Sequence, residues 1–152
     1  MRIANLNIRD VARLAGLSTK QIDLAINRWS VTPHFKKVAP GSPREFTKAD
    51  TFVFCIAGEL VRMGLSWPAI REIIWSATTM VEVNPTTFEQ LQIFPGASRF
   101  VEAVLVVRNF SADELPEATL IERDELRKIG SDAAIILPAS RIARRIEAEA
   151  AA

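Results

Sequence analysis

The stretch from Ile8 to Ile22 constrains the fold most strongly, because it encodes two short helices separated by a tight turn. Its first half carries apolar residues at helical spacing, namely Ile8, Val11, Ala12 and Ala15. Gly16 can adopt the left-handed backbone that ends a helix, and Ser18 is a residue type that caps the start of the next one. A second apolar stripe follows at Ile22, Ala25 and Ile26. The pattern therefore predicts helices over about residues 8–15 and 19–28.

Two helices joined in this way can place the second helix in the major groove of DNA. Polar side chains in the first turn of that helix, and a cation at its end, can reach base edges or phosphates. These candidate DNA-binding residues are Ser18, Thr19, Lys20, Gln21 and Arg28. A solvated first turn is the plainer alternative, and Arg28 could equally be a cation that stabilises the C-terminal end of its helix.

Residues 29–46 cannot continue a helix, because three prolines and a glycine lie among them. We interpret this segment as a loop or short hairpin. Its basic residues Lys36, Lys37 and Arg44 are typical of a wing, which grips the DNA backbone or minor groove beside a helix-turn-helix. A solvated loop of ordinary charge is the alternative. Phe46 is expected to anchor the segment to the core rather than to contact DNA.

Two further helices are expected between the wing and Trp75. Thr47 and Asp50 form a capping-box-like pattern before the first of them. Gly64 is expected to end that helix, and Ser66 to cap the next. The first of the two is strongly apolar on a wide face, so it should be deeply buried.

The chain changes character after these helices. Runs rich in β-branched residues predict strands at 101–107, 118–122 and 133–137, with a short helix at 123–129 and a terminal helix at 140–150. We therefore predict an α+β fold with two domains. Residues 1–76 form a mainly α winged helix-turn-helix with four helices and a wing. Residues 77–152 form a small α+β region, with about three strands and the terminal helix, for oligomerisation or partner binding.

Residues 8–75 contain four landmarks in series: the segment Val11–Ser18, the break at Pro33, the segment Arg44–Thr47 and the segment Leu60–Ile74. In this order and spacing they resemble the DNA-binding domain of MerR-type regulators, a winged helix-turn-helix followed by a second helix pair. The resemblance implies double-stranded DNA as the ligand. It also implies that Arg44, at the family's wing-closing position, contacts a phosphate or the minor groove.

The chain departs from that family at several positions. The middle of the family's second helix usually carries one basic and two aromatic residues, where this chain has Asp23, Leu24 and Ala25. The glycine that follows this helix is replaced by Trp29 or Ser30. The second half of the chain lacks sustained heptads, so the long antiparallel dimer helix of the family is not expected.

The net charge of +1 is unevenly distributed along the chain. Residues 1–75 hold eleven Lys and Arg against six Asp and Glu, whereas residues 76–152 hold eight against twelve. A basic first half can meet phosphates, and an acidic second half is unsuited to lie along a duplex. A chance fluctuation in composition would give the same asymmetry.

Several other classes of function find no support in the sequence. No glycine-rich phosphate loop, paired-cysteine spacing or nucleophile elbow occurs, so neither an enzyme nor a cofactor is expected. His34 is the only histidine and lies in no cluster of metal ligands, so no metal is expected. Cys55 lies in an apolar run and is expected to be a buried hydrophobe, with a single-thiol sensor as the alternative. No signal peptide or membrane span is recognisable, which favours a cytoplasmic location.

The sequence therefore predicts a sequence-specific double-stranded DNA-binding protein, a MerR-like transcriptional regulator of bacterial or phage type. A single small module makes a limited DNA interface, so we expect at least a homodimer. The first alternative is a phage-type accessory protein, such as an excisionase or small DNA-packaging subunit, that recruits a catalytic partner through residues 77–152. The second alternative is an interaction adaptor that has lost DNA binding, for which Asp23 and the missing aromatic residues of the second helix are the best support.

Overall fold

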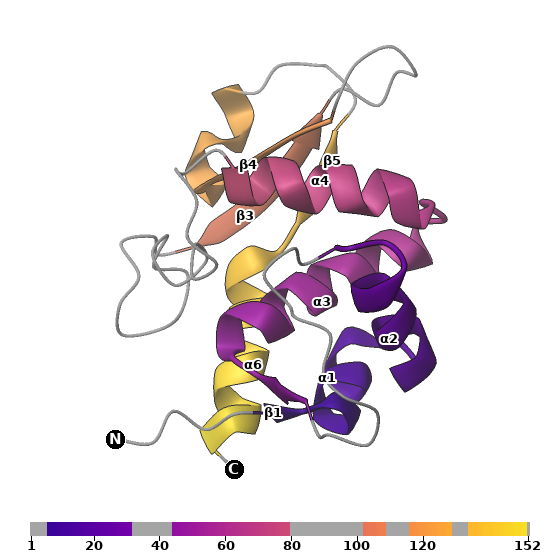
Figure 1. Cartoon of the computed structure of the whole chain (residues 1–152). Helices are drawn as coiled ribbons and strands as arrows, with labels where there is room; N and C mark the ends of the chain where they lie inside the picture. The colour runs from indigo at the N-terminus through magenta and orange to yellow at the C-terminus, as the bar shows by residue number, and fades with distance from the viewer. Residues whose placement is uncertain (1–5, 32–43, 80–101, 109–115, 129–133, 152) are drawn as a thin grey trace.

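The computed structural model describes residues 6–31, 44–79, 102–108, 116–128 and 134–151 (Figure 1). The helices are α1 (Ile8–Ala15), α2 (Thr19–Asn27), α3 (Lys48–Arg62), α4 (Trp67–Thr79), the 3-10 helix η1 (Arg123–Lys128) and α6 (Ala139–Ala151). The strands are β1 (Leu6–Asn7), β2 (Glu45–Phe46), β3 (Ala103–Arg108), β4 (Glu117–Glu122) and β5 (Ile135–Leu137). Helices thus combine with two small antiparallel sheets, which is the predicted α+β class.

The two helices expected at the start of the chain are present. The Asn7 side chain caps α1 by accepting hydrogen bonds from the backbone N–H groups of Arg9 and Asp10, at 2.9 and 3.0 Å. Gly16 ends α1 with a φ of 67°, and the Ser18 side chain caps α2. Both residues therefore act as predicted, and a three-residue turn joins the helices.

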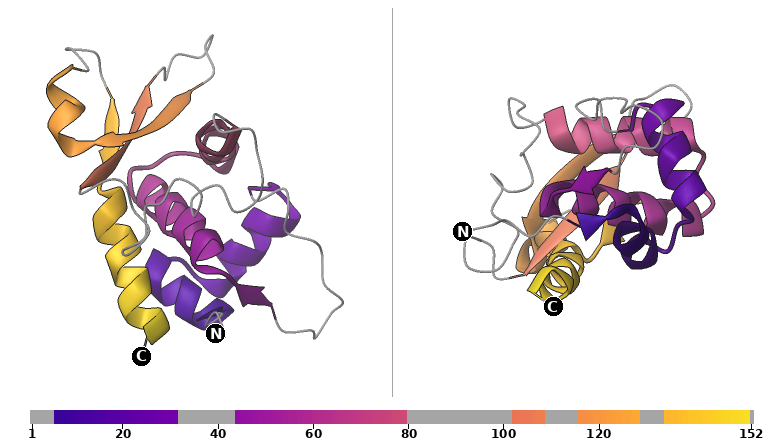
Figure 2. Two further views of the ribbon diagram at one scale, coloured as in Figure 1. Left: turned by 90° about the vertical axis from the view of Figure 1, so that its left-hand side faces the viewer. Right: turned by 60° about the horizontal axis from the view of Figure 1, so that its bottom comes forward.

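Helix α3 is the centre of the molecule. Thr47 and Asp50 form a capping box at its start, as the sequence indicates. Every residue from Ala49 to Gly58 is buried, on all faces of the helix. This burial follows from the packing of α1, α4 and α6 around α3 (Figure 2). A helix that is apolar on all sides needs such complete cover.

Strands β1 and β2 were not expected from the sequence. They pair antiparallel, with Leu6 opposite Phe46 and Asn7 opposite Glu45. Each strand has only two residues, which is too short for a recognisable alternation of apolar and polar side chains. The pairing brings the chain that leads into α3 beside the start of α1.

The second sheet has the order β4–β3–β5 and confirms the three predicted strands, with ends shifted by one or two residues. The short helix expected over 123–129 is present as the 3-10 helix η1. None of its residues is buried, so the segment has no buried apolar stripe whose packing would stabilise an α-helix. The terminal helix α6 is present as predicted.

One hydrophobic cluster includes buried residues from both halves of the chain. Helix α6 packs on α3, and α4 packs on β4. Figure 2 shows α6 on the opposite side of α1 and α3 from α2. Ion pairs from Arg13 to Glu149 and from Lys48 to Glu147 tie α6 to α1 and α3. The division into domains at residue 76 stays a prediction, and the two halves share this core.

The contact between α1 and α3 is close at Gly58. A Cβ atom at this position would lie 1.9 Å from the carbonyl oxygen of Ala15. That oxygen is part of the backbone, so the helices would have to separate to admit a methyl group. We expect Gly58→Ala to lower the free energy of unfolding by about 2 kcal/mol, as measured by urea denaturation.

Gly64→Ala is a matched control for this substitution, because its Cβ would meet open space. It should lose only about 1 kcal/mol, the cost of the left-handed backbone at a φ of 87°. A Gly58→Ala variant as stable as the unmodified protein would contradict the prediction.

Candidate nucleic-acid interface

Helix α2 presents two distinct faces. Ile22, Ala25 and Ile26 are buried against the core. Helical periodicity places Lys20, Leu24 and Asn27 on the opposite face, and all three are exposed. Helix α2 lies at the edge of the molecule (Figure 1). Lys20 and Leu24 of this face are therefore exposed at the molecular surface.

The predicted residues at the start of α2 divide into two kinds. Ser18 and Gln21 form a capping box, in which Gln21 N–H donates to Ser18 Oγ at 3.1 Å and Ser18 N–H donates to Gln21 Oε1 at 2.8 Å. Their side chains thus stabilise the helix start. Thr19 and Lys20 are exposed, and within the described chain no ion pair or hydrogen bond engages the Lys20 ammonium group. The first-turn amides and Lys20 together form an anion-attracting end.

Arg44 occupies an unexpected environment. Its guanidinium donates to Asp23 Oδ1 at 2.9 Å and to Asn27 Oδ1 at 3.3 Å. The Arg44 side chain is only 10% exposed, whereas that of Asp23 is 51% exposed. Arg44 therefore fastens the middle of α2 to the segment that enters β2. A phosphate contact by Arg44 stays a prediction, and any such contact must compete with this pair.

The pair also accounts for Asp23, the acidic residue on a helix expected to meet phosphates. Its carboxylate lies beside the Arg44 guanidinium, so the two charges largely cancel at short range. Asp23 is thus a structural partner of Arg44, and its presence alone does not argue against DNA binding by α2.

The end of α2 is held by a third contact. Ser30, rather than Trp29, takes the left-handed backbone, with a φ of 49°. The Ser30 carbonyl accepts a hydrogen bond from Trp75 Nε1 at 3.1 Å, which links this turn to α4. The exposed Arg28 guanidinium lies over the Trp29 ring, 5.0 Å from its centroid. Arg28 therefore adds positive charge at the far end of the exposed face.

The remaining predicted wing residues, Lys36 and Lys37, lie outside the described residues, as does His34. The wing itself stays a prediction for the same reason. Phe46, at its predicted base, is fully buried and packs edge-on against Phe54 with ring centroids 5.7 Å apart. Its expected role in the core is confirmed.

Sequence reasoning missed Arg62 at the turn between α1 and α2. Its guanidinium donates to the carbonyl oxygen of Ala15 at 3.1 Å and also pairs with Glu59. A Cβ on Gly16 would lie 2.3 Å from Arg62 Nη1, so the guanidinium covers this glycine. The contact joins residues 47 positions apart, and no local pattern in the sequence signals it.

Cys55 is buried, with 5% of its surface exposed, as expected for a small hydrophobe in α3. Burial raises the pKa of its thiol to about 12. The thiol is therefore protonated at neutral pH, whereas a redox sensor needs an accessible thiolate. No group of residues that could hold a metal ion occurs among those the structure describes.

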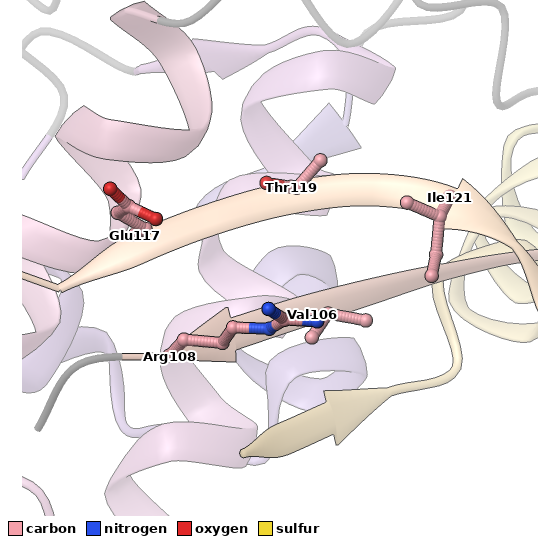
Figure 3. A pocket seen from close by; sticks show the side chains of 5 residues that line it. All are labelled: Val106, Arg108, Glu117, Thr119 and Ile121. Carbon is pink, nitrogen blue, oxygen red and sulfur yellow. The ribbon is translucent and has the colours of Figure 1, made fainter. Parts of the chain in front are cut away.

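A second surface lies on the face of the β4–β3–β5 sheet that carries Val104 and Val106. A hollow of about 220 Å³ is lined by Val106, Arg108, Glu117, Thr119 and Ile121 (Figure 3). Ile136 on β5 extends this face and is 48% exposed. The hollow is lined by both apolar and charged side chains.

Comparison of the chain with models of known protein families finds no match, and a search of curated protein sequences finds none either. Within the described chain, no helix has both the length and the apolar character needed to cross a bilayer.

The Asp23–Arg44 pair can be tested by a double-mutant cycle. Arg44 is largely buried, so removal of its carboxylate partner should lower the free energy of unfolding more than the loss of a fully exposed ion pair would. We expect Asp23→Ala and Arg44→Ala to show a coupling free energy of about 1 kcal/mol in urea denaturation. Asp23→Ala combined with Arg127→Ala is the control, since η1 lies across the molecule from α2 (Figure 1), and these changes should be additive. Additivity in both cycles would contradict the role given to Arg44.

Proposed function

We propose that this protein binds double-stranded DNA sequence-specifically, as a MerR-like winged helix-turn-helix regulator of transcription. One observation carries the proposal: α2 is held at its start, middle and end, yet its outward face stays exposed between two cations. Lys20 and Arg28 lie at the two ends of that face. A fixed helix with an exposed, positively charged face is what insertion into the major groove requires. The four landmarks in residues 8–75 support the same assignment.

In this proposal the two ends of α2 bind phosphates and the middle approaches the bases. Lys20 and the amides of the first turn bind a phosphate of the DNA strand on one side of the groove. Arg28 binds a phosphate on the other side of the groove, and its guanidinium stacks on Trp29. Lys36 and Lys37 bind the backbone or minor groove beside it. Such contacts make affinity strongly dependent on salt.

Lys20→Ala tests the proposed electrostatic contact. We expect this variant to bind all duplex sequences more weakly and to reduce the slope of log affinity against log salt by about one unit. Fluorescence anisotropy of a labelled duplex at several salt concentrations gives both quantities. Arg127→Ala removes an exposed cation from η1 and should leave the slope unchanged. Identical slopes for both variants and the unmodified protein would exclude the assigned DNA face.

We also infer self-association, because one such module alone buries too little surface for tight and specific binding. The sheet face around Ile136 is the surface we assign to a second copy or to another protein. Light scattering at micromolar concentration should give at least twice the chain mass of 16.9 kDa, alone or on DNA. A strict monomer under both conditions would rule the dimer out.

The same sheet face supports one alternative, a phage-type accessory protein that recruits a catalytic partner to DNA. In that case α2 would bind DNA in the same way, while the exposed Ile136 and the hollow beside it would contact the partner. Pull-down of a recombinase or packaging enzyme by the unmodified protein, but not by Ile136→Glu, would favour this alternative.

A further inference from the structure

Leu24 stands out on the exposed face of α2, because it is the one large aliphatic side chain of that helix that the core leaves out. It is 39% exposed, whereas the other large aliphatic residues of α2, Ile22 and Ile26, are almost fully buried. It lies on the outermost line of the helix, one turn after Lys20 and one turn before Arg28. Leu24 thus occupies the part of α2 that would reach deepest into a groove.

The polar groups beside Leu24 are committed to other contacts. Asp23 is paired with Arg44 at 2.9 Å, and the Asn27 side-chain oxygen accepts a second hydrogen bond from the same guanidinium. These bonds hold both side chains toward Arg44, on one flank of the exposed face. The centre of the face is therefore apolar, and cations lie at its two ends.

Resting on the proposed function, we propose that Leu24 reads the C5-methyl group of thymine in the major groove. The methyl group is the only alkyl group that base pairs present there, and apolar side chains discriminate thymine by contact with it. We assign DNA to this face because its positive charges complement the phosphates of a duplex. Exposed cations at Lys20 and Arg28 flank Leu24, at the places where a duplex has a phosphate on each side of its groove.

The experiment begins with selection of bound duplexes from a random library by the unmodified protein. Each thymine of the selected site is then replaced, one at a time, by deoxyuridine, which lacks only the methyl group. One thymine in each half-site should show about a fourfold loss of affinity, as expected for loss of about one buried methyl group. The same replacement should have no effect on Leu24→Ala, whose shorter side chain no longer reaches the methyl group.

Met63→Ala is the matched control, because Met63 is also exposed and apolar but lies at the end of α3. It should keep the full fourfold loss on deoxyuridine replacement. Alanine favours helix formation and Leu24 contributes little to the core, so Leu24→Ala should fold.

The outcomes separate the two levels of the proposal. If no duplex is enriched in the selection, the proposed DNA binding fails. If a site is enriched but no thymine shows a dependence on its methyl group, or Leu24→Ala keeps that dependence, DNA binding stands and the role of Leu24 is overturned. The measurement on the unmodified protein is sufficient to overturn it, even if Leu24→Ala binds too weakly to measure.

Discussion

Burial of α3 on every side is the constraint on which the rest of the structure depends. The helix can be covered completely only if its neighbours approach closely, and Gly58, which has no side chain, allows the backbone of α1 to do so. On another side, the ring of Phe46 packs edge-on against Phe54 and so holds β2 against α3. At the end of α3, Arg62 binds the last carbonyl of α1. These contacts place α1, β2 and the turn before α2 around one axis.

Helix α2 depends on this arrangement indirectly. Its buried stripe has only three residues, so apolar packing alone attaches α2 weakly to the rest of the molecule. Its direction is set instead by three contacts: the covered turn at Gly16, the guanidinium of Arg44, and the hydrogen bond from Trp75 to Ser30. All three contacts originate from elements arranged around α3. A short helix can thus keep a defined orientation while most of its polar surface stays exposed.

Much of this fold is predictable from the sequence, because local signals determine it. The residues that end or cap helices, Gly16, Ser18 and Thr47, act where the pattern indicates. The three predicted strands are also present, since β-branched runs are a local signal. The short helix over 123–129 is present as well, and only its 3-10 form was not specified, because the charged segment 123–128 has no buried apolar stripe.

The candidate interface was less predictable, since it depends on contacts between distant residues. Asp23 is an unfavourable charge when α2 is considered alone, and it becomes a partner only when residue 44 is brought beside it. The outward position of Leu24 is an exception, because the predicted stripe of Ile22, Ala25 and Ile26 already places it on the opposite face of the helix. The structure buries these same three residues and leaves Leu24 39% exposed.

In the proposed complex with DNA, the Asp23–Arg44 pair affects the balance between general and specific binding. Because the pair is close to neutral, the net attraction of α2 for phosphates comes from Lys20, Arg28 and the helix N-terminus. Affinity that is independent of sequence grows with the number of phosphate contacts, so the two cations of α2 would add little of it. In the proposal, contacts between α2 and base edges then supply a larger share of what this helix contributes to binding. A helix that gains little from charge alone is better suited to discriminate between sequences than to hold any duplex firmly.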